Sequence, residues 1–328
     1  MLKIIISPAK TMKTDPETLP VSGLPQFEQD AERILRDLRG LSYEQLKALW
    51  GCSDKLCEEN RARLLAMDWL EDPPRAMLTP ALMTPAVLAY IGIQYQALSA
   101  VTLEQSALDY LQRHLRILSG VYGVLRAFDG VVPYRLEMQA KAEIGGAKDL
   151  YSFWGSRLYE ALLGEEQDGM RASDSGEKEK TAAVPSAPSA APSATISAAP
   201  SAAPSTAPSA ASSAAASAAN RTKAAKPADN EKTLIVNLAS REYAKAIEPY
   251  LDGRAEYVTC VFAEWSAGKL RQKATAAKTA RGEMARWMAE TNVQTKEALC
   301  GFDRRGYAFS EAASDAHTFV FERKTGHS

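Results

Sequence analysis

The sequence predicts a mixed α/β fold in which helices surround a central sheet. Two short apolar runs rich in β-branched residues, 2–7 and 233–240, are typical of buried strands. Between these runs, apolar residues recur at steps of three and four, which is the spacing of amphipathic helices. The chain has 328 residues, of which 46% are hydrophobic and 24% are charged, so it can bury a sizeable core.

The first predicted strand ends in a polar loop, residues 7–11, which contains Ser7 and Lys10. Polar side chains at the carboxyl end of a buried strand could hold an anionic ligand, and the alternative is a loop with a solvated lysine. The second predicted strand contains Asn237 and ends at Ser240, a residue suited to cap a following helix. Because parallel strands present their loops at one edge of a sheet, we expect these four side chains to share a crevice.

Helices are predicted at 27–38, 42–50, 53–69 and 151–163. Gly40 closes the first of them, and Ser42 and Gln45 have the spacing of a capping box at the start of the second. Near the carboxyl end, two short alternating aromatic runs, around 307–309 and 319–321, predict terminal strands.

The segment 108–138 is predicted to form a helix-hairpin-helix, an element that grips phosphate. Leucines from Leu108 to Leu118 recur at helical steps, and the turn from Leu118 to Gly123 has the order hydrophobe, any residue, Gly, hydrophobe, any residue, Gly. Glycine lets backbone N–H groups approach a phosphate oxygen because no Cβ intervenes. The alternative is an ordinary helical hairpin whose glycines only cap and pack, and Pro133 cuts the second helix short.

On this interpretation the turn holds phosphate and flanking arginines neutralise neighbouring phosphates. The residues assigned to this contact are Ser119, Gly120, Val121 and Gly123 in the turn, with Arg116 and Arg126 on either side.

Two further segments have charge patterns that bear on ligand binding. Arg135 and Glu137 alternate along an extended segment, where their pairing is either structural or fixes a functional arginine. Residues 269–281 contain basic side chains and no acid, among them Lys273, Lys278 and Arg281. A charge run is usually a solvated face, but the lack of interleaved acids favours an anionic partner.

Composition argues against a globally basic protein, a protein with disulfides or a metal site, and a secreted or membrane-spanning protein. The formal net charge is −1, so any basic surface must be local. The four cysteines and three histidines are scattered, which predicts reduced thiols, no metal site and no cofactor. The apolar run at the N-terminus is too short for a signal peptide or a membrane span, so we expect a cytoplasmic protein without a membrane partner.

Composition changes abruptly near residue 165. Residues 165–180 are highly charged, and residues 181–219 consist almost entirely of Ala, Ser and Pro without a charged side chain. Such a segment cannot bury enough apolar area to offset its ordering entropy. We predict that residues 165–230 form a disordered low-complexity insertion.

Several blocks of the sequence resemble the peroxide-stress YaaA family, also known as UPF0246 or DUF328. They are ISPAKT at 6–11, LRILSGVYGVLRAFDGVVPYRLEM at 115–138, KDLYSFWG at 148–155, VNLASREY at 236–243 and AKTARG at 277–282. The resemblance implies one discontinuous domain, 1–164 with 231–328, because family members cross the insertion point without the insertion. Two blocks depart from the family pattern: residues 126–129 read RAFD, and residues 92–95 read GIQY, which lacks the family's acid.

The resemblance also implies a bacterial, cytoplasmic protein that limits free iron and oxidative DNA damage under hydrogen peroxide, and so an association with the nucleoid. It implies a helix-hairpin-helix and a positively charged cleft that binds double-stranded DNA, and it brings no established catalytic activity. Our first hypothesis is therefore a non-enzymatic DNA-binding protein that contacts the DNA backbone. The expected contacts are the hairpin residues above together with Arg135, Lys273, Lys278 and Arg281.

The alternative hypothesis is an enzyme that acts on a nucleotide or a damaged base. Here Ser7, Asn237 and Ser240 would line a crevice for a small nucleotide. Lys10 would act as nucleophile or phosphate clamp, and Glu137 would act as acid or base.

Overall fold

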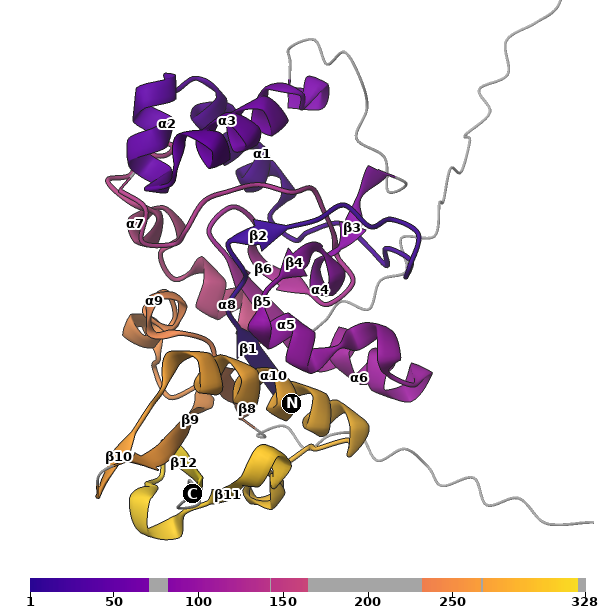
Figure 1. Ribbon diagram of the computed structural model, residues 1–328, viewed down its shortest axis with the longest axis vertical. Coiled ribbons are helices and arrows are strands. Elements are labelled where there is room, and N and C mark those ends of the chain that lie inside the picture. The colour runs from indigo at the N-terminus through magenta and orange to yellow at the C-terminus, as the bar shows by residue number, and fades with distance from the viewer. Residues whose placement is uncertain (71–81, 142, 165–231, 267, 324–328) are drawn as a thin grey trace, which may run out of the picture. The chain divides into compact units, whose positions relative to one another are not determined.

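The computed structural model describes residues 1–70, 82–141, 143–164, 232–266 and 268–323. Within these residues a mixed sheet of eight strands has the order β11-β12-β9-β8-β1-β5-β6, with β10 paired to β9 (Figure 1). The strands are β1 (Leu2–Ile6), β5 (Leu115–Ser119), β6 (Gly123–Arg126), β8 (Thr233–Leu238), β9 (Ala255–Ser266), β10 (Lys269–Arg271), β11 (Tyr307–Phe309) and β12 (Thr318–Arg323). The predicted mixed α/β fold is confirmed.

The middle of the sheet is parallel. Strand β1 pairs in parallel with β5 on one side and with β8 on the other, and β8 continues in parallel to β9 and β9 to β12. Strands β6, β10 and β11 are antiparallel to their neighbours. Because β1 and β8 are adjacent, the segments before and after residues 165–231 contribute to one sheet. The predicted insertion at 165–230 lies outside the described residues.

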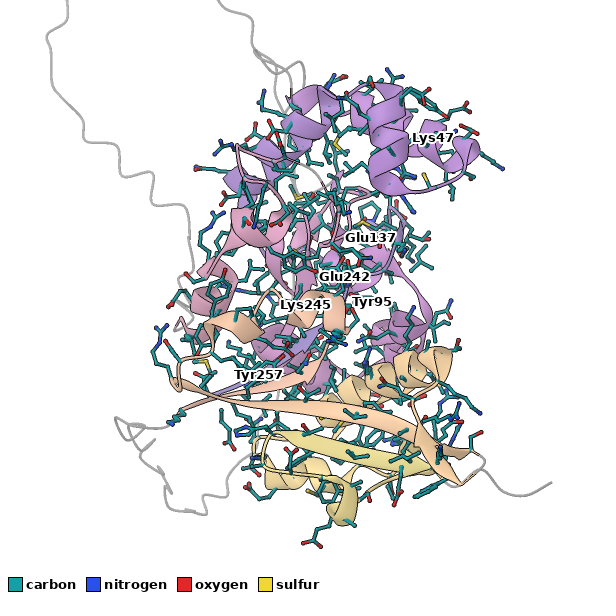
Figure 2. All side chains as sticks on the ribbon, turned by 90° about the vertical axis from the view of Figure 1, so that its left-hand side faces the viewer. Lys47, Tyr95, Glu137, Glu242, Lys245 and Tyr257 are labelled. Atoms are coloured by element: carbon teal, nitrogen blue, oxygen red, sulfur yellow. The ribbon has the colours of Figure 1, made fainter. Side chains whose placement is uncertain are left out.

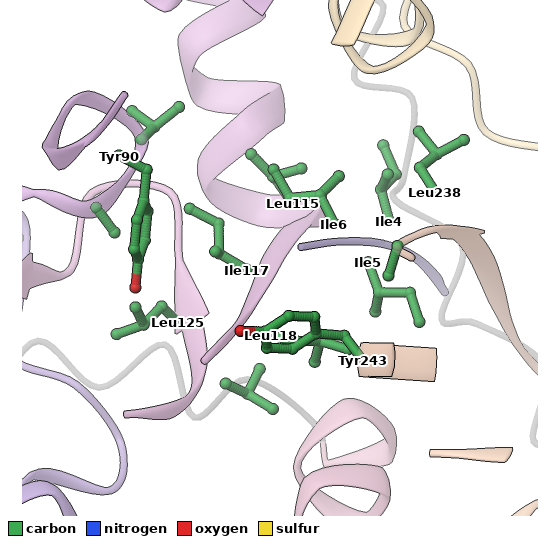
Figure 3. Packing of buried hydrophobic residues seen from close by; sticks show 14 of the residues in the cluster. Ile4, Ile5, Ile6, Tyr90, Leu115, Ile117, Leu118, Leu125, Leu238 and Tyr243 are labelled. Atoms are coloured by element: carbon green, nitrogen blue, oxygen red, sulfur yellow. The ribbon is translucent and has the colours of Figure 1, made fainter. Parts of the chain in front are cut away.

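Strand β1 is buried over its whole length, because its isoleucines contact apolar side chains on both faces of the sheet. Figure 3 shows Ile4, Ile5 and Ile6 packed among Leu115 and Leu238 of the flanking strands. Two minor sheets complete the strands: β2 (Thr11–Met12) pairs with β4 (Tyr90–Ile91), and β3 (Thr84–Pro85) pairs with β7 (Gly130–Val131).

The α-helices of the described residues are α1 (Glu28–Arg39), α2 (Tyr43–Trp50), α3 (Asp54–Leu65), α4 (Ala86–Ala89), α5 (Ile93–Leu98), α6 (Gln105–His114), α7 (Leu150–Trp154), α8 (Arg157–Leu163), α9 (Arg241–Ala244) and α10 (Ala274–Glu290). The predicted capping box is confirmed, since the Ser42 hydroxyl accepts a hydrogen bond from the Gln45 N–H and the Gln45 side chain accepts one from the Ser42 N–H. Helix α10 packs beside α5 and α6 (Figure 1). Short 3-10 helices occur at Asp68–Leu70, Ala100–Thr102, Glu248–Tyr250, Glu297–Gly301, Arg304–Gly306 and Glu311–Ala313.

The predicted helix-hairpin-helix is wrong, because the chain makes a β-hairpin there. Helix α6 ends at His114, and residues 115–119 then form β5, which pairs with β6 across a tight turn. The leucine spacing runs across the boundary between a helix and a strand, and buried apolar side chains on both faces of the sheet favour the strand.

Hydrogen bonds to other residues of the protein hold the turn of this hairpin. The Ser119 hydroxyl accepts hydrogen bonds from the N–H groups of Val121 and Tyr122, and the Gly120 carbonyl accepts one from the Trp154 indole. Gly123 has φ +68°, and a Cβ there would lie 2.9 Å from the Phe27 ring. The glycines therefore serve a tight turn against the core.

Candidate functional site

The candidate site lies where two neighbouring parallel strands of the sheet end. From β1 the chain crosses to β5 on one side, whereas β8 lies on the other side of β1 and continues to β9, away from it. In open α/β sheets such a reversal of strand order opens a crevice beyond the carboxyl ends of the strands, and ligands bind there. The loops that leave β1 and β8 line this crevice.

Ser7 and Ser240 join the two loops. The Ser240 backbone N–H donates to the Ser7 hydroxyl oxygen at 2.7 Å, and the two hydroxyl oxygens are 3.1 Å apart. The Tyr95 hydroxyl donates to the Ser7 carbonyl at 2.9 Å, which fixes the same loop from the side of α5. The prediction that Ser7 and Ser240 come together at one sheet edge is therefore confirmed.

Asn237 does not line the crevice, but its side chain holds the residues next to it by hydrogen bonds. Its side-chain oxygen accepts a hydrogen bond from the Ala239 N–H at 2.9 Å, and its amide nitrogen donates to the Thr259 hydroxyl at 3.2 Å. Since Asn237 is buried in β8, it shapes the turn towards Ser240 and leaves ligand contact to its neighbours.

A cavity of about 430 Å³ opens at this edge. Side chains from five segments far apart in the sequence line it: the loop after β1, the start of α5, the segment 134–137, the start of α9 and the first half of α10. The charged lining residues are Lys10, Arg135, Lys278 and Arg281 with Glu137 and Glu242, and the apolar wall includes Ile91, Ile93, Tyr95, Tyr134 and Tyr243.

Three buried donors of this cavity have no hydrogen-bond partner among the described residues. They are the Gln94 side-chain amide nitrogen and the Nε atoms of Arg135 and Arg281. Burial also lowers the pKa of Arg281, because removing the guanidinium from water disfavours its charge. Unsatisfied buried donors cost free energy, so an acceptor-rich ligand in the cavity would relieve this cost.

The two carboxylates of the cavity have different surroundings. Glu137 forms an ion pair with Lys10, whose Nζ atom lies 2.7 Å from Glu137 Oε1. Glu242 accepts a hydrogen bond from the Gln139 N–H at 3.3 Å. Burial, and to a smaller degree the neighbouring Glu137, raises the pKa of Glu242. Figure 2 shows Glu137, Glu242 and Tyr95 close to one another, as expected of residues that line one cavity.

The turn residues assigned to DNA contact are buried, which argues against that assignment. Ser119 and Val121 have no exposed surface, and Gly120 and Gly123 are also buried. The Arg116 guanidinium donates to the carbonyls of Gln112 and Leu115, inside the protein.

The remaining basic residues do not form one continuous cleft. Arg135, Lys278 and Arg281 line the cavity beside Lys10, whereas Arg126 lies in β6 and does not line it. Lys273 lies in a separate depression, where its Nζ atom is 3.1 Å from the buried Glu264 carboxylate.

Sequence reasoning missed Gln94, Tyr95 and Glu242. Glu242 lies two residues after Ser240, so a search of the turn that follows the second strand would have found it. Gln94 and Tyr95 lie in the GIQY block, which the family resemblance marked only as a departure from the family pattern. Only the tertiary contact of α5 with the strand ends shows that this block lines the cavity.

No group of three or more His, Cys, Asp or Glu side chains among the described residues could hold a metal ion. No helix in the same residues is both long and apolar enough to cross a membrane.

The sequence of the chain is similar to those of known proteins. The family described as peroxide stress protein YaaA matches residues 2–180 and 216–313. UPF0246 proteins of Lactiplantibacillus plantarum and Agathobacter rectalis are 38% and 36% identical to the chain, over 98% of it and 98% and 99% of their own lengths. A UPF0246 protein of Lachnoclostridium phytofermentans is 37% identical, over 98% of the chain and 96% of that protein. The chain therefore belongs to the peroxide stress protein YaaA family, which confirms the resemblance noted in the sequence.

Proposed function

We propose that the chain acts in peroxide stress by binding a small phosphate-bearing ligand in the crevice between β1 and β8. The family supports the role in peroxide stress. The observation that carries the ligand proposal is the set of buried donors without acceptors, Gln94, Arg135 and Arg281, around one cavity.

The chemistry of the crevice favours a phosphate over other anions. A phosphate offers several acceptor oxygens at once, and planar guanidinium groups match its geometry. Lys10 and Lys278 add positive charge at the same cavity, and the hydroxyls of Ser7 and Ser240 lie at its strand-end side. A carboxylate ligand would satisfy fewer of these donors.

DNA binding takes a different form under this proposal. A cavity of about 430 Å³ cannot admit a duplex, and the hairpin that was expected to grip one is buried. A DNA ligand would have to present a terminal or extruded nucleotide to the crevice. Free nucleotides and DNA ends therefore share the chemistry that the site would recognise.

Equilibrium binding tests the proposal. Inorganic phosphate, nucleoside monophosphates and blunt duplex DNA would be titrated calorimetrically into the full-length chain. We expect at least one phosphorylated small molecule to bind, and we expect Arg281→Gln and Lys278→Gln each to weaken that binding about tenfold or more, since each removes a charge-assisted contact.

Arg271→Gln is the matched control, because Arg271 belongs to the same basic run but is exposed on β10, outside the cavity. Thermal melting would establish that every variant is folded. The absence of binding by any phosphorylated compound at millimolar concentration, or an equal loss of affinity in the control, would contradict the proposal.

A further inference from the structure

Glu137 and Glu242 form a pair of carboxyl groups across one face of the cavity. Both contact Gln139: its backbone N–H donates to Glu242 Oε1 at 3.3 Å, and its side-chain amide lies 3.5 Å from Glu137 Oε2. The two acids come from segments about one hundred residues apart in the sequence, and the fold brings them to the same ligand-sized space. The arrangement brings two groups that can transfer protons to one ligand-sized cavity.

The surroundings of the two carboxyl groups differ. Glu137 has a cation within hydrogen-bond distance, since Lys10 Nζ lies 2.7 Å from its Oε1 atom. Glu242 makes no ion pair among the described residues, is partly buried, and faces the negative charge of Glu137. Among the described residues, the charge of Lys10 partly offsets these effects on Glu242, and Lys10 is paired with Glu137. One carboxyl group beside a lysine and one partly buried without an ion pair give the cavity two acids in different environments, which is the usual basis of an acid–base pair.

The rest of the cavity identifies the kind of molecule that such a pair would meet. One part offers cations and hydroxyls for a phosphate, as argued for the proposed function on which this inference rests. Another part offers Ile91 and Ile93, whose apolar side chains are partly exposed, and Tyr95 lines the same cavity. A flat heterocycle fits such a wall, and a sugar would bridge it to the phosphate.

We propose that the crevice hydrolyses the N-glycosidic bond of a nucleoside 5′-monophosphate, with Glu242 as general acid and Glu137 as general base. The C1′–N bond breaks, and the protonated carboxyl of Glu242 gives its proton to the departing base nitrogen. Glu137 takes a proton from the water whose oxygen bonds to C1′. The products are the free base and the sugar 5-phosphate, and proton exchange with solvent restores both carboxyl groups. An acid that protonates the leaving base and a base that activates water each lower the barrier to such a cleavage.

The test follows release of free base by chromatography. The full-length chain would be incubated with ribo- and deoxyribonucleoside 5′-monophosphates of the common bases and of 8-oxoguanine. We expect release from at least one substrate and a loss of about a hundredfold or more in Glu242→Gln and in Glu137→Gln. Glu143→Gln, which changes an exposed acid outside the cavity, should keep the full rate.

The pH dependence separates a catalytic role from a structural one. The wild-type rate should fall as pH rises past the pKa of Glu242, because the acid form is then lost. Glu242→Gln should lose this limb of the profile and retain substrate affinity. Binding of nucleotides without any base release would overturn the proposal and leave the proposed ligand site standing. Absence of both binding and release would overturn the two together.

Discussion

The raised pKa of Glu242 has a consequence for the stability of the fold. Burial is the main cause that raises its pKa from 4.5, and the charge of Glu137 adds to it. The folded protein therefore binds this proton more tightly than the unfolded chain does. The stability that this bound proton contributes is fully present below about pH 4.5, the pKa of the unfolded chain. It is lost as pH rises through the pKa of Glu242 in the folded protein, because the carboxyl group then ionises.

Replacing Glu242 by glutamine should stabilise the protein by an amount that depends on pH. Glu242→Gln cannot ionise, so its free energy of unfolding relative to wild type should increase as pH rises from 4.5 towards 7. Urea denaturation at a series of pH values measures the difference. Glu143→Gln provides the charge-matched control, and parallel pH profiles for wild type and Glu242→Gln would show that burial does not act on this group as described.

At the scale of elements, the approach of α10 to α5 positions the cavity wall. Gly282 lies in α10, and a Cβ built there would be 2.0 Å from the Gln94 carbonyl oxygen and 2.8 Å from the Ala97 Cβ. Only glycine allows this separation. The same two helices carry Gln94 and Arg281, so their spacing sets the distance between two of the unsatisfied donors.

Gly282→Ala should therefore affect both stability and binding. The added methyl group meets backbone that cannot rotate away, so we expect a loss of about 3 kcal/mol in unfolding free energy and weaker phosphate binding. Chemical denaturation and calorimetry measure the two effects. Gly40→Ala is the control, since its Cβ would come no closer than 3.4 Å to any neighbour at a helix end with ordinary backbone angles. Equal losses in both variants would refute the close-packing argument.

Elements with a local signal were predictable from the sequence, and those set by tertiary pairing were not. A few neighbouring residues suffice to predict β1 from its isoleucines, β8 from its apolar run and the start of α2 from its capping box. The hairpin of β5 and β6 does not, because leucines three and four residues apart suit a helix and a doubly buried strand equally well. For the same reason Ser7 and Ser240 were found from strand ends, whereas Gln94 depended on where α5 packs.

At the scale of the whole molecule, the sheet joins the two halves of the sequence. Strand β8 lies between β1 and β9, with Ile4 opposite Val236 in the register. Without β8, the apolar strand β1 would expose an unpaired edge, and β8 without β1 would do the same. Exposed apolar edges promote aggregation, so neither half should be stable alone.

Two fragments test this dependence. We expect residues 1–164 and residues 232–328, expressed separately, to aggregate or remain unfolded. Expressed together, they should form a soluble 1:1 complex that melts cooperatively and binds the same phosphorylated ligands as the full chain, because the sheet and the crevice need both segments. Size-exclusion chromatography with light scattering, thermal melting and calorimetry provide the measurements. Cooperative unfolding by either fragment alone would mean that the halves are separate folding units, and the crevice between β1 and β8 would then be an interface between two domains.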